Sequence, residues 1–484
     1  MLARAVTHAL VGLEARRVEV EAHVRDGLPS FAIVGLADKA CQEARERVRS
    51  GIVSAELQFP KGRVTVNLAP AELRKAGSGF DLPIALAVLA ASHQLPHAAL
   101  EQHAAVGELA LDGRLRRVGG VLAVAEGARR LGLERLLCPP ESAAEAALAG
   151  VEPVAIRHLA DAVAYLRGEL EPDPPPPPRT HERPVAADLA EVRGQERARR
   201  ALELAAAGGH NLLLGGPPGT GKTMLARRLP GILPRLSPDA ALEVTRIHSV
   251  AGLLPPEHPL IEEPPFRAPH HSASTAAIVG GGPGLQPGEA SLAHRGVLLL
   301  DELAEFARPS LEALRQPLED GFVSVARAAG RIVFPARFQL VATMNLCPCG
   351  ARGDPAIECT CSAQRLARYR DKLSRALLDR FDLVVAVPRP RASELAGAAG
   401  EPSATVRARV AGAREALVGG ALPRASDADE LLSRAVERLP LSGRGRARVA
   451  RVARTIAALA GSETVLAEHL AEALSYRSPQ ELAA

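Results

Sequence analysis

The stretch Gly216-Pro-Pro-Gly-Thr-Gly-Lys-Thr223 follows a short apolar run, His210–Leu214, and precedes a helical run, Met224–Leu229. This is the strand–loop–helix context of a phosphate-binding loop, in which glycines let backbone N–H groups wrap phosphates at a helix N-terminus. We expect Lys222 to reach the β- and γ-phosphates and the Thr223 hydroxyl to ligate Mg²⁺. A turn that matches by accident is the alternative. The predicted ATP-binding residues are Gly216, Pro217, Pro218, Gly219, Thr220, Gly221, Lys222 and Thr223.

An apolar run that ends in two acids, Val297-Leu-Leu-Leu-Asp-Glu302, lies about 80 residues after this loop. Its end predicts that Asp301 enters the Mg²⁺ shell and that Glu302 activates the water that attacks the γ-phosphate. Four apolar residues followed by two acids are common at strand ends. The two motifs together therefore predict ATP hydrolysis more strongly than either motif alone.

Two further polar residues belong to this prediction. Asn345 follows the next apolar run, Phe338–Thr343, so its amide can position the attacking water, although a plain turn asparagine fits as well. Arg380 lies in Leu377-Leu-Asp-Arg-Phe-Asp382 and is a candidate arginine finger, which stabilises charge on the transferred phosphoryl group of a neighbouring subunit. The alternative for Arg380 is an ordinary surface pair with an aspartate.

The chain has 484 residues, of which 47% are hydrophobic and 24% charged, which indicates a soluble protein of several domains. The proline run at 174–178 predicts a stiff linker over 171–184. Before it, residues 1–170 alternate strand-like and helical runs, which favours an α/β domain. After it we expect an α/β ATPase core over 185–390 and a helical domain over 391–484.

The composition also limits the partners. Nine Phe, three Tyr and no Trp argue against binding that depends on stacking bases on aromatic rings. The net charge of +4 means that a polyanion must meet a local basic surface. Neither a secretory signal nor an apolar run of membrane-spanning length is visible in the sequence, so we expect a cytoplasmic protein without a membrane partner.

The nucleotide motifs, Asn345 and the Arg380 motif together resemble AAA+ ATPases of the magnesium-chelatase and MCM-like branch. Phe266-Arg-Ala-Pro-His-His-Ser-Ala-Ser, Pro287-Gly-Glu-Ala-Ser-Leu-Ala-His and Cys347-Pro-Cys-Gly resemble the ComM/YifB family more closely, over essentially the whole chain. The resemblance implies a hexameric, ATP- and Mg²⁺-dependent DNA helicase that acts on single-stranded or branched DNA and promotes branch migration during recombination. It also implies that Arg444, in a helical lid domain, is the sensor arginine that touches the γ-phosphate.

The first domain resembles the proteolytic domain of Lon, through Arg74-Lys-Ala-Gly-Ser-Gly-Phe-Asp and the stretch 106–120. That protease needs a serine nucleophile activated by a lysine. In the same register Gly79 stands at the nucleophile and Leu122 at the lysine. The resemblance therefore implies a Lon-like α/β fold without the protease, used for assembly or DNA contact.

Two segments are candidates for DNA binding. Two strand-like pieces within Leu318–Phe334 predict a hairpin with Arg327 and Arg331 at its tip, where the MCM-like branch has a pore hairpin that grips the nucleic-acid backbone. The segment 252–290, with Arg267, resembles a second pore insertion. The alternative for both is a solvated loop.

Four of the six cysteines, Cys347, Cys349, Cys359 and Cys361, have a spacing that could hold a structural Zn²⁺. The alternative is a reduced cluster without metal. Two other functions remain open at this point. One is a protein-remodelling or metal-inserting ATPase that uses the same motor on another substrate, and the other is a Lon-type protease, which Gly79 and Leu122 disfavour.

Overall fold

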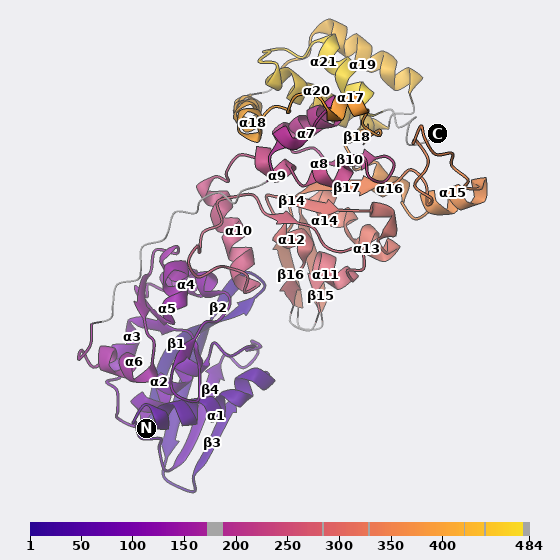
Figure 1. The fold of residues 1–484 in the computed structure, drawn as a ribbon. Helices are drawn as coiled ribbons and strands as arrows, with labels where there is room; N and C mark the ends of the chain where they lie inside the picture. Colours follow the sequence, from indigo (N-terminus) through magenta and orange to yellow (C-terminus); the bar gives the residue numbers. More distant parts are fainter. Residues whose placement is uncertain (172–186, 283–284, 328–329, 421, 440–441, 478–484) are drawn as a thin grey trace. The chain divides into compact units, whose positions relative to one another are not determined.

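The computed structural model describes residues 1–171, 187–282, 285–327, 330–420, 422–439 and 442–477 (Figure 1). The chain packs as two compact units, one of Met1–Glu182 with Ala241–Ile261 and one of Arg183–Ala240 with Glu262–Ala484. Each unit combines a β-sheet with helices, which confirms the predicted α/β fold class. The predicted linker over 171–184 lies outside the described residues apart from Glu171. None of the helices in the described part of the chain has the length and apolar character that a membrane span requires.

The first unit is built on a seven-stranded mixed sheet with the order β3-β4-β2-β1-β5-β8-β9. Its strands are β1 (Leu2–Val11), β2 (Glu14–Arg25), β3 (Ser30–Val34), β4 (Arg63–Ala69), β5 (His103–Ala105), β8 (Arg135–Cys138) and β9 (Glu152–Ala155), with a small extra pair, β6 (Glu108–Leu109) and β7 (Leu115–Arg116). Its helices are α1 (Lys39–Ser54), α2 (Asp81–Ala91), α3 (Ala98–Glu101), α4 (Val121–Arg130), α5 (Pro140–Ala147) and α6 (Leu159–Leu166). Helix α2 is buried along its whole length, because its apolar residues pack on β1, β2 and α1.

A segment from the middle of the chain completes this unit. Helix α10 (Pro238–Val250) carries Arg246, which pairs with Glu126 of α4 at 3.0 Å from Nε to Oε2. The backbone carbonyl of Ser249 accepts a hydrogen bond from the Gly120 amide at 2.9 Å. The hydroxyl of Ser249 donates to Glu145, a buried carboxylate. Residues 241–261, which we predicted within the ATPase core, therefore pack with the first unit, and the predicted single insertion over 252–290 is divided at Ile261.

The second unit is built on a five-stranded parallel sheet with the order β11-β14-β17-β10-β18. The strands are β10 (Leu212–Gly215), β11 (Phe266–Arg267), β14 (Val297–Leu300), β17 (Gln339–Met344) and β18 (Leu383–Ala386). β10 and β14 are continuous apolar runs because helices cover both faces of a parallel sheet. The helices of this sheet are α7 (Glu196–Gly208), α8 (Lys222–Ala226), α9 (Leu229–Ile232), α11 (Thr275–Val279), α12 (Glu289–Leu292), α13 (Arg308–Ala313), α14 (Arg315–Asp320), α15 (Ala363–Arg370), α16 (Arg375–Leu378) and α17 (Ala392–Leu395).

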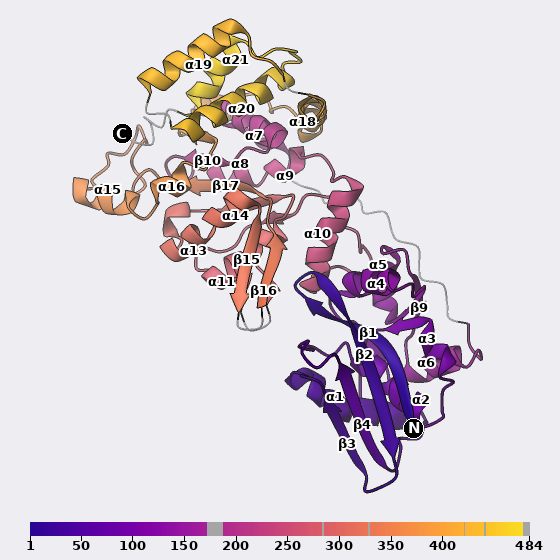
Figure 2. The same cartoon turned by 180° about the vertical axis from the view of Figure 1, so that it is seen from behind.

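Two short antiparallel pairs accompany this sheet. One joins β12 (Gly280–Gly281) to β13 (Gln286–Pro287). The other joins β15 (Phe322–Arg327) to β16 (Gly330–Pro335), and Figure 2 shows these two strands running side by side. The hairpin predicted within Leu318–Phe334 is therefore present.

The C-terminal residues form four helices, α18 (Ser403–Val418), α19 (Ser426–Arg438), α20 (Gly443–Leu459) and α21 (Ala467–Ser475). The sequence predicts a helical region here, and these four elements are helices. Their apolar faces share one core with α7 and with the sheet, through buried residues such as Val410, Val452 and Leu202. The helical region thus packs in the same compact unit as the ATPase sheet.

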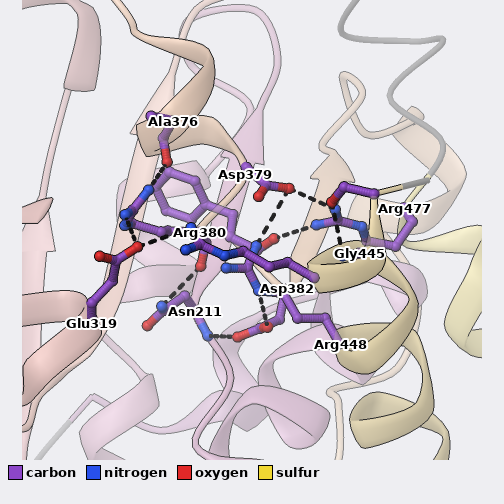
Figure 3. Close-up of polar contacts among 12 residues, drawn as sticks. Asn211, Glu319, Ala376, Asp379, Arg380, Asp382, Gly445, Arg448 and Arg477 are labelled. Carbon is purple, nitrogen blue, oxygen red and sulfur yellow. Dashed lines mark hydrogen bonds and ion pairs between the residues drawn. The ribbon is translucent and has the colours of Figure 1, made fainter. Parts of the chain in front are cut away.

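Ion pairs fasten the helical region to the sheet (Figure 3). Asp382 accepts from the backbone N–H of Asn211 at 3.0 Å and pairs with Arg448 of α20 at 3.5 Å from Nε to Oδ1. Asp379 pairs with Arg477 at 3.2 Å. The two aspartates of the motif 377–382 therefore hold the C-terminal region.

We expect Asp382→Ala to destabilise the second unit by about 1–3 kcal/mol, because the backbone N–H of Asn211 loses its acceptor and the half-buried Arg448 keeps only one of its two carboxylates, Asp379. Denaturant unfolding followed by circular dichroism measures the loss. Asp371→Ala, at an exposed helix end, is the matched control. Equal midpoints for the two variants would contradict the role of Asp382.

Candidate active site

The phosphate-binding loop lies at the carboxyl end of β10, as predicted. Gly219 and Gly221 have φ of +75° and +90°, a left-handed backbone that favours glycine. A Cβ on Gly216 would lie 2.2 Å from the carbonyl oxygen of Val387 in the strand region alongside, so only glycine fits there. Helix α8 begins at Lys222 and directs its N-terminus at the loop.

Lys222 and Asn345 meet at this loop. Lys222 is 8% exposed, and its Nζ donates to the carbonyl oxygens of Gly216 at 2.8 Å and Pro217 at 2.6 Å. The same Nζ donates to Oδ1 of Asn345 at 3.1 Å. Burial lowers the pKa of Lys222, and the nearby charges of Asp301 and Glu302 oppose that shift.

Asp301 lies at the carboxyl end of β14, two strands away from β10, with β17 between them. Its Oδ1 accepts from the hydroxyl of Thr223 at 2.8 Å and from that of Thr343 at 2.6 Å. Glu302 follows with φ of +57°, and its backbone N–H donates to Thr343 Oγ1 at 3.0 Å. Carboxylate and hydroxyl oxygens are the donors that Mg²⁺ prefers, so Thr223 and Asp301 fit the metal.

Sequence reasoning missed two parts of this site. One is Thr343, whose only signal is a hydroxyl near the end of an otherwise apolar strand. The other is a cavity of about 640 Å³ between the loop and the chain around Gln195 and Val387. Gln195 has φ of +54° and donates to the carbonyl oxygen of Pro388 at 2.8 Å. The cavity borders Gly216 and Pro217 of the loop.

Arg380 and Arg444 lie at the opposite edge of the sheet. The Asn211 side chain, directly before β10, donates to the carbonyl oxygen of Arg380 at 2.9 Å, whereas the loop follows β10 at its other end. β10 has four residues, so its amino and carboxyl ends are roughly 13 Å apart. The chain therefore does not bring these arginines to its own Lys222.

Glu319 contacts both arginines, and Figure 3 shows its contact with Arg380. The Arg380 guanidinium is 5% exposed and donates to Glu319 and to the carbonyl oxygen of Ala376. Arg444 donates to the same Oε1 of Glu319 at 3.0 Å and is 69% exposed. Arg380 pairs with Glu319 rather than with an aspartate of its own motif. A cavity of about 560 Å³ at this edge is lined by Glu319, Arg380 and further arginines, namely Arg295, Arg337, Arg414, Arg448 and Arg451.

The predicted DNA-binding residues lie on three strands, Arg267 on β11, Arg327 on β15 and Arg331 on β16. Arg331 is exposed on β16 and donates to Ser324 Oγ at 2.6 Å. Arg327 ends β15 opposite Gly330. Arg267, on β11, forms a two-pronged ion pair with Glu289 at 2.6 and 2.7 Å, so that carboxylate already balances its charge.

The four cysteines predicted to hold zinc come together. Their Sγ atoms all lie within 4.8 Å of one another. In the first unit, Gly79 precedes α2 and Leu122 is fully buried in α4. Neither position carries a group that could act as nucleophile or base.

Comparison with known proteins identifies the family. Family models match residues 188–395 (magnesium chelatase, subunit ChlI), 20–142 (subunit ChlI of Mg-chelatase) and 418–477 (magnesium chelatase, subunit ChlI C-terminal). An uncharacterized protein of Mycobacterium tuberculosis is 47% identical over 98% of both chains. YifB of Escherichia coli is 43% identical over 98% of this chain and 97% of its own, and competence protein ComM of Haemophilus influenzae is 43% identical over 99% and 97%. The chain belongs to the ComM/YifB family of magnesium-chelatase-like AAA+ proteins, a membership that indicates ATPase activity.

Proposed function

We propose that this protein is an ATP-dependent, hexameric DNA motor that moves branched DNA and aids the integration of single-stranded DNA during transformation and homologous recombination. A relative of nearly full length carries the name competence protein, which supports the association with DNA uptake. The observation that carries the proposal is the position of Arg380 and Arg444 at the sheet edge opposite the phosphate-binding loop.

The residues at the loop have separate roles in ATP hydrolysis. Lys222 and the loop amides bind the phosphates, and Thr223 with Asp301 would hold Mg²⁺, which neutralises charge on the phosphates when it is bound. Glu302 acts as the base for the attacking water, and Asn345 orients that water from beside Lys222.

The complete site needs two chains. An arginine that stabilises the transferred phosphoryl group must approach the phosphates closely, yet Arg380 and Arg444 lie at the far edge of their own sheet. A neighbour docked head-to-tail would bring this edge to the next loop. A contact that repeats head-to-tail closes into a ring when the rotation permits. The proposal therefore includes a homo-hexamer with ATP sites at the subunit boundaries.

The DNA contact is proposed for the β15–β16 hairpin. Arg331 is exposed there, and Arg327 lies at the end of the paired strand. Arginine forks bind phosphate oxygens with little regard to base sequence, which suits a motor that tracks a backbone. Arg267 is proposed as an additional contact in the second insertion.

We expect Arg331→Ala to weaken binding of single-stranded DNA and to reduce the salt dependence of binding by about one phosphate contact, because one guanidinium leaves the interface. Fluorescence anisotropy over a salt series measures both quantities. Arg434→Ala, an exposed arginine on α19, is the matched control. An unchanged salt slope for Arg331→Ala would place the DNA elsewhere.

The function as a whole is tested by measuring ATP turnover with and without single-stranded and forked DNA. Stimulation by DNA together with movement of a labelled fork supports the motor. The alternative is a protein-remodelling or chelatase-type ATPase with a substrate other than nucleic acid. Robust turnover that no DNA changes, with no salt-sensitive DNA binding, favours that alternative.

We propose ATP and Mg²⁺ as the ligands of the loop, Zn²⁺ as a structural metal at the cysteines, and the cytoplasm as the location. The 1–170 region is proposed to serve assembly or DNA contact as a Lon-like domain without protease activity, with 185–390 as the ATPase core and 391–484 as the lid.

A further inference from the structure

The arrangement of the four cysteine sulfurs suits a tetrahedral metal. The Sγ atoms of Cys347 and Cys349 are 3.2 Å apart, and Cys359 lies 3.7 Å from each of them. Four thiolates at about 2.3 Å from Zn²⁺ would lie about 3.8 Å from one another, whereas the sulfurs of a disulfide are about 2.05 Å apart. The measured separations are closer to those of a metal tetrad than to that of a disulfide, and four thiolates leave no coordination position open for catalysis.

The backbone around the first two cysteines is shaped for this tetrad. The N–H of Arg352 donates to Cys347 Sγ at 3.3 Å, a bond that orients a metal-bound thiolate. The N–H of Gly350 donates to the carbonyl oxygen of Cys347 at 3.1 Å and closes the turn. Gly350 and Gly353 have φ of +82° and +83°, so the turn needs glycine at both positions.

The same turn packs against the phosphate-binding loop. A Cβ on Gly350 would lie 3.0 Å from Cδ of Pro218, and one on Gly353 would lie 3.9 Å from Cδ of Pro217. The cysteine turn and the two prolines of the loop are thus in close contact. If the cysteine turn shifts toward the phosphate-binding loop, it displaces Pro217 and Pro218.

The cysteines also lie close in the sequence to Asn345 and to helix α15, which contacts it. Cys347 follows Asn345 by two residues, and Cys361 lies directly before the cap of α15 at Ser362. From α15, Tyr369 donates its hydroxyl to the carbonyl oxygen of Asn345 at 3.1 Å. A metal that ties Cys347 to Cys361 therefore fixes both the chain after Asn345 and the helix that contacts it.

We infer that Zn²⁺ held by the four cysteines is a clamp that positions Asn345 and the prolines of the phosphate-binding loop, so that metal content controls ATP hydrolysis. The coupling rests on the proposed ATPase function, whereas the metal site rests on the cysteines alone. Asn345 acts on the attacking water, and the cysteines act through Asn345 as positioning residues.

Metal analysis of the purified full-length protein tests the site first. One zinc per chain is expected, and trypsin cleavage after Arg352 should slow when zinc is bound, because the closed turn protects that bond. Iron in place of zinc, or well under one metal per chain after purification without chelator, overturns the assignment.

Reversible removal of the metal tests the coupling without a mutation. Zinc is removed with a chelator under reducing conditions, and the protein is then returned to chelator-free buffer with excess Mg²⁺. Its kcat should be lower by roughly 10- to 100-fold, because small displacements of a positioned group cost that much. The affinity for a fluorescent ATP analogue should change less than kcat, and added ZnCl₂ should restore turnover. Unchanged kcat after complete removal overturns the clamp.

A double variant, Cys359→Ser with Cys361→Ser, should lose the metal and show the same fall in kcat. Cys138→Ala, a buried cysteine in β8 of the first unit, is the matched control and should keep both zinc and turnover. If zinc-loaded wild-type protein fails to hydrolyse ATP, the proposed ATPase function fails while the metal site stands, so the two failures are distinguishable.

Discussion

Glu302→Gln is expected to lower ATP turnover by roughly 10²- to 10⁴-fold, which is the usual contribution of a positioned general base. Glu302 is exposed at the carboxyl end of β14, and its backbone is held by Thr343. Glutamine keeps the size of the side chain but cannot accept the proton of the attacking water. Binding of ATP should persist, because Lys222 and the loop amides are unchanged.

Phosphate release measures the turnover, and a fluorescent nucleotide measures binding. Glu305→Gln is the matched control, since Glu305 is an exposed acid three residues on that pairs with Lys372 at 3.5 Å. Full turnover by Glu302→Gln would mean that the base is another group. Equal loss in both variants would indicate a change of local structure rather than loss of the base.

Arg380→Ala is expected to lower turnover by roughly 10³- to 10⁵-fold, the range found for arginine fingers. Its backbone contacts Asn211 at the amino end of β10 and its guanidinium pairs with Glu319, away from its own phosphate-binding loop, so the loss should occur at a neighbour's site. Arg375→Ala, an exposed arginine on α16 in the same segment, is the matched control and should retain activity.

Mixing two inactive variants separates action between chains from action within one chain. An Arg380→Ala subunit keeps Glu302, and a Glu302→Gln subunit keeps Arg380. An ATP site is therefore complete where the Arg380→Ala subunit supplies the phosphate-binding loop and the Glu302→Gln neighbour supplies the arginine. Random mixing in a ring should restore about a quarter of the sites. No recovery of turnover in mixtures shown to contain both variants in one ring would contradict the assignment between chains.

The core of the site was predictable because its motifs are local. Each motif can be recognised from a few consecutive residues. One is a glycine-rich loop between a strand and a helix, and the other is a pair of acids at the end of an apolar strand. The parallel sheet then brings Thr223, Asp301 and Asn345 together, since the carboxyl ends of neighbouring strands meet at one edge.

Other features depend on contacts between distant residues and were not predictable. The sequence of β1 gives a weak strand signal because it contains three alanines, Arg4 and His8, and its long pairing with β2 stabilises it as a strand. The packing of residues 241–261 with the first unit depends on Glu126 and Glu145, more than 90 residues earlier in the chain. The sharing of Glu319 by Arg380 and Arg444 likewise joins three segments that no local pattern relates.

The central claim is that the phosphate-binding loop of one chain and the arginine edge of the next form a single ATP site in a ring that holds DNA. Electron microscopy of Glu302→Gln protein with ATP and a forked oligonucleotide tests it most directly. We predict six-membered rings with Arg380 of each subunit at its neighbour's nucleotide and with DNA against the β15–β16 hairpins. Single subunits, or rings whose arginine edges face away from the nucleotide and whose hairpins touch no DNA, would contradict it.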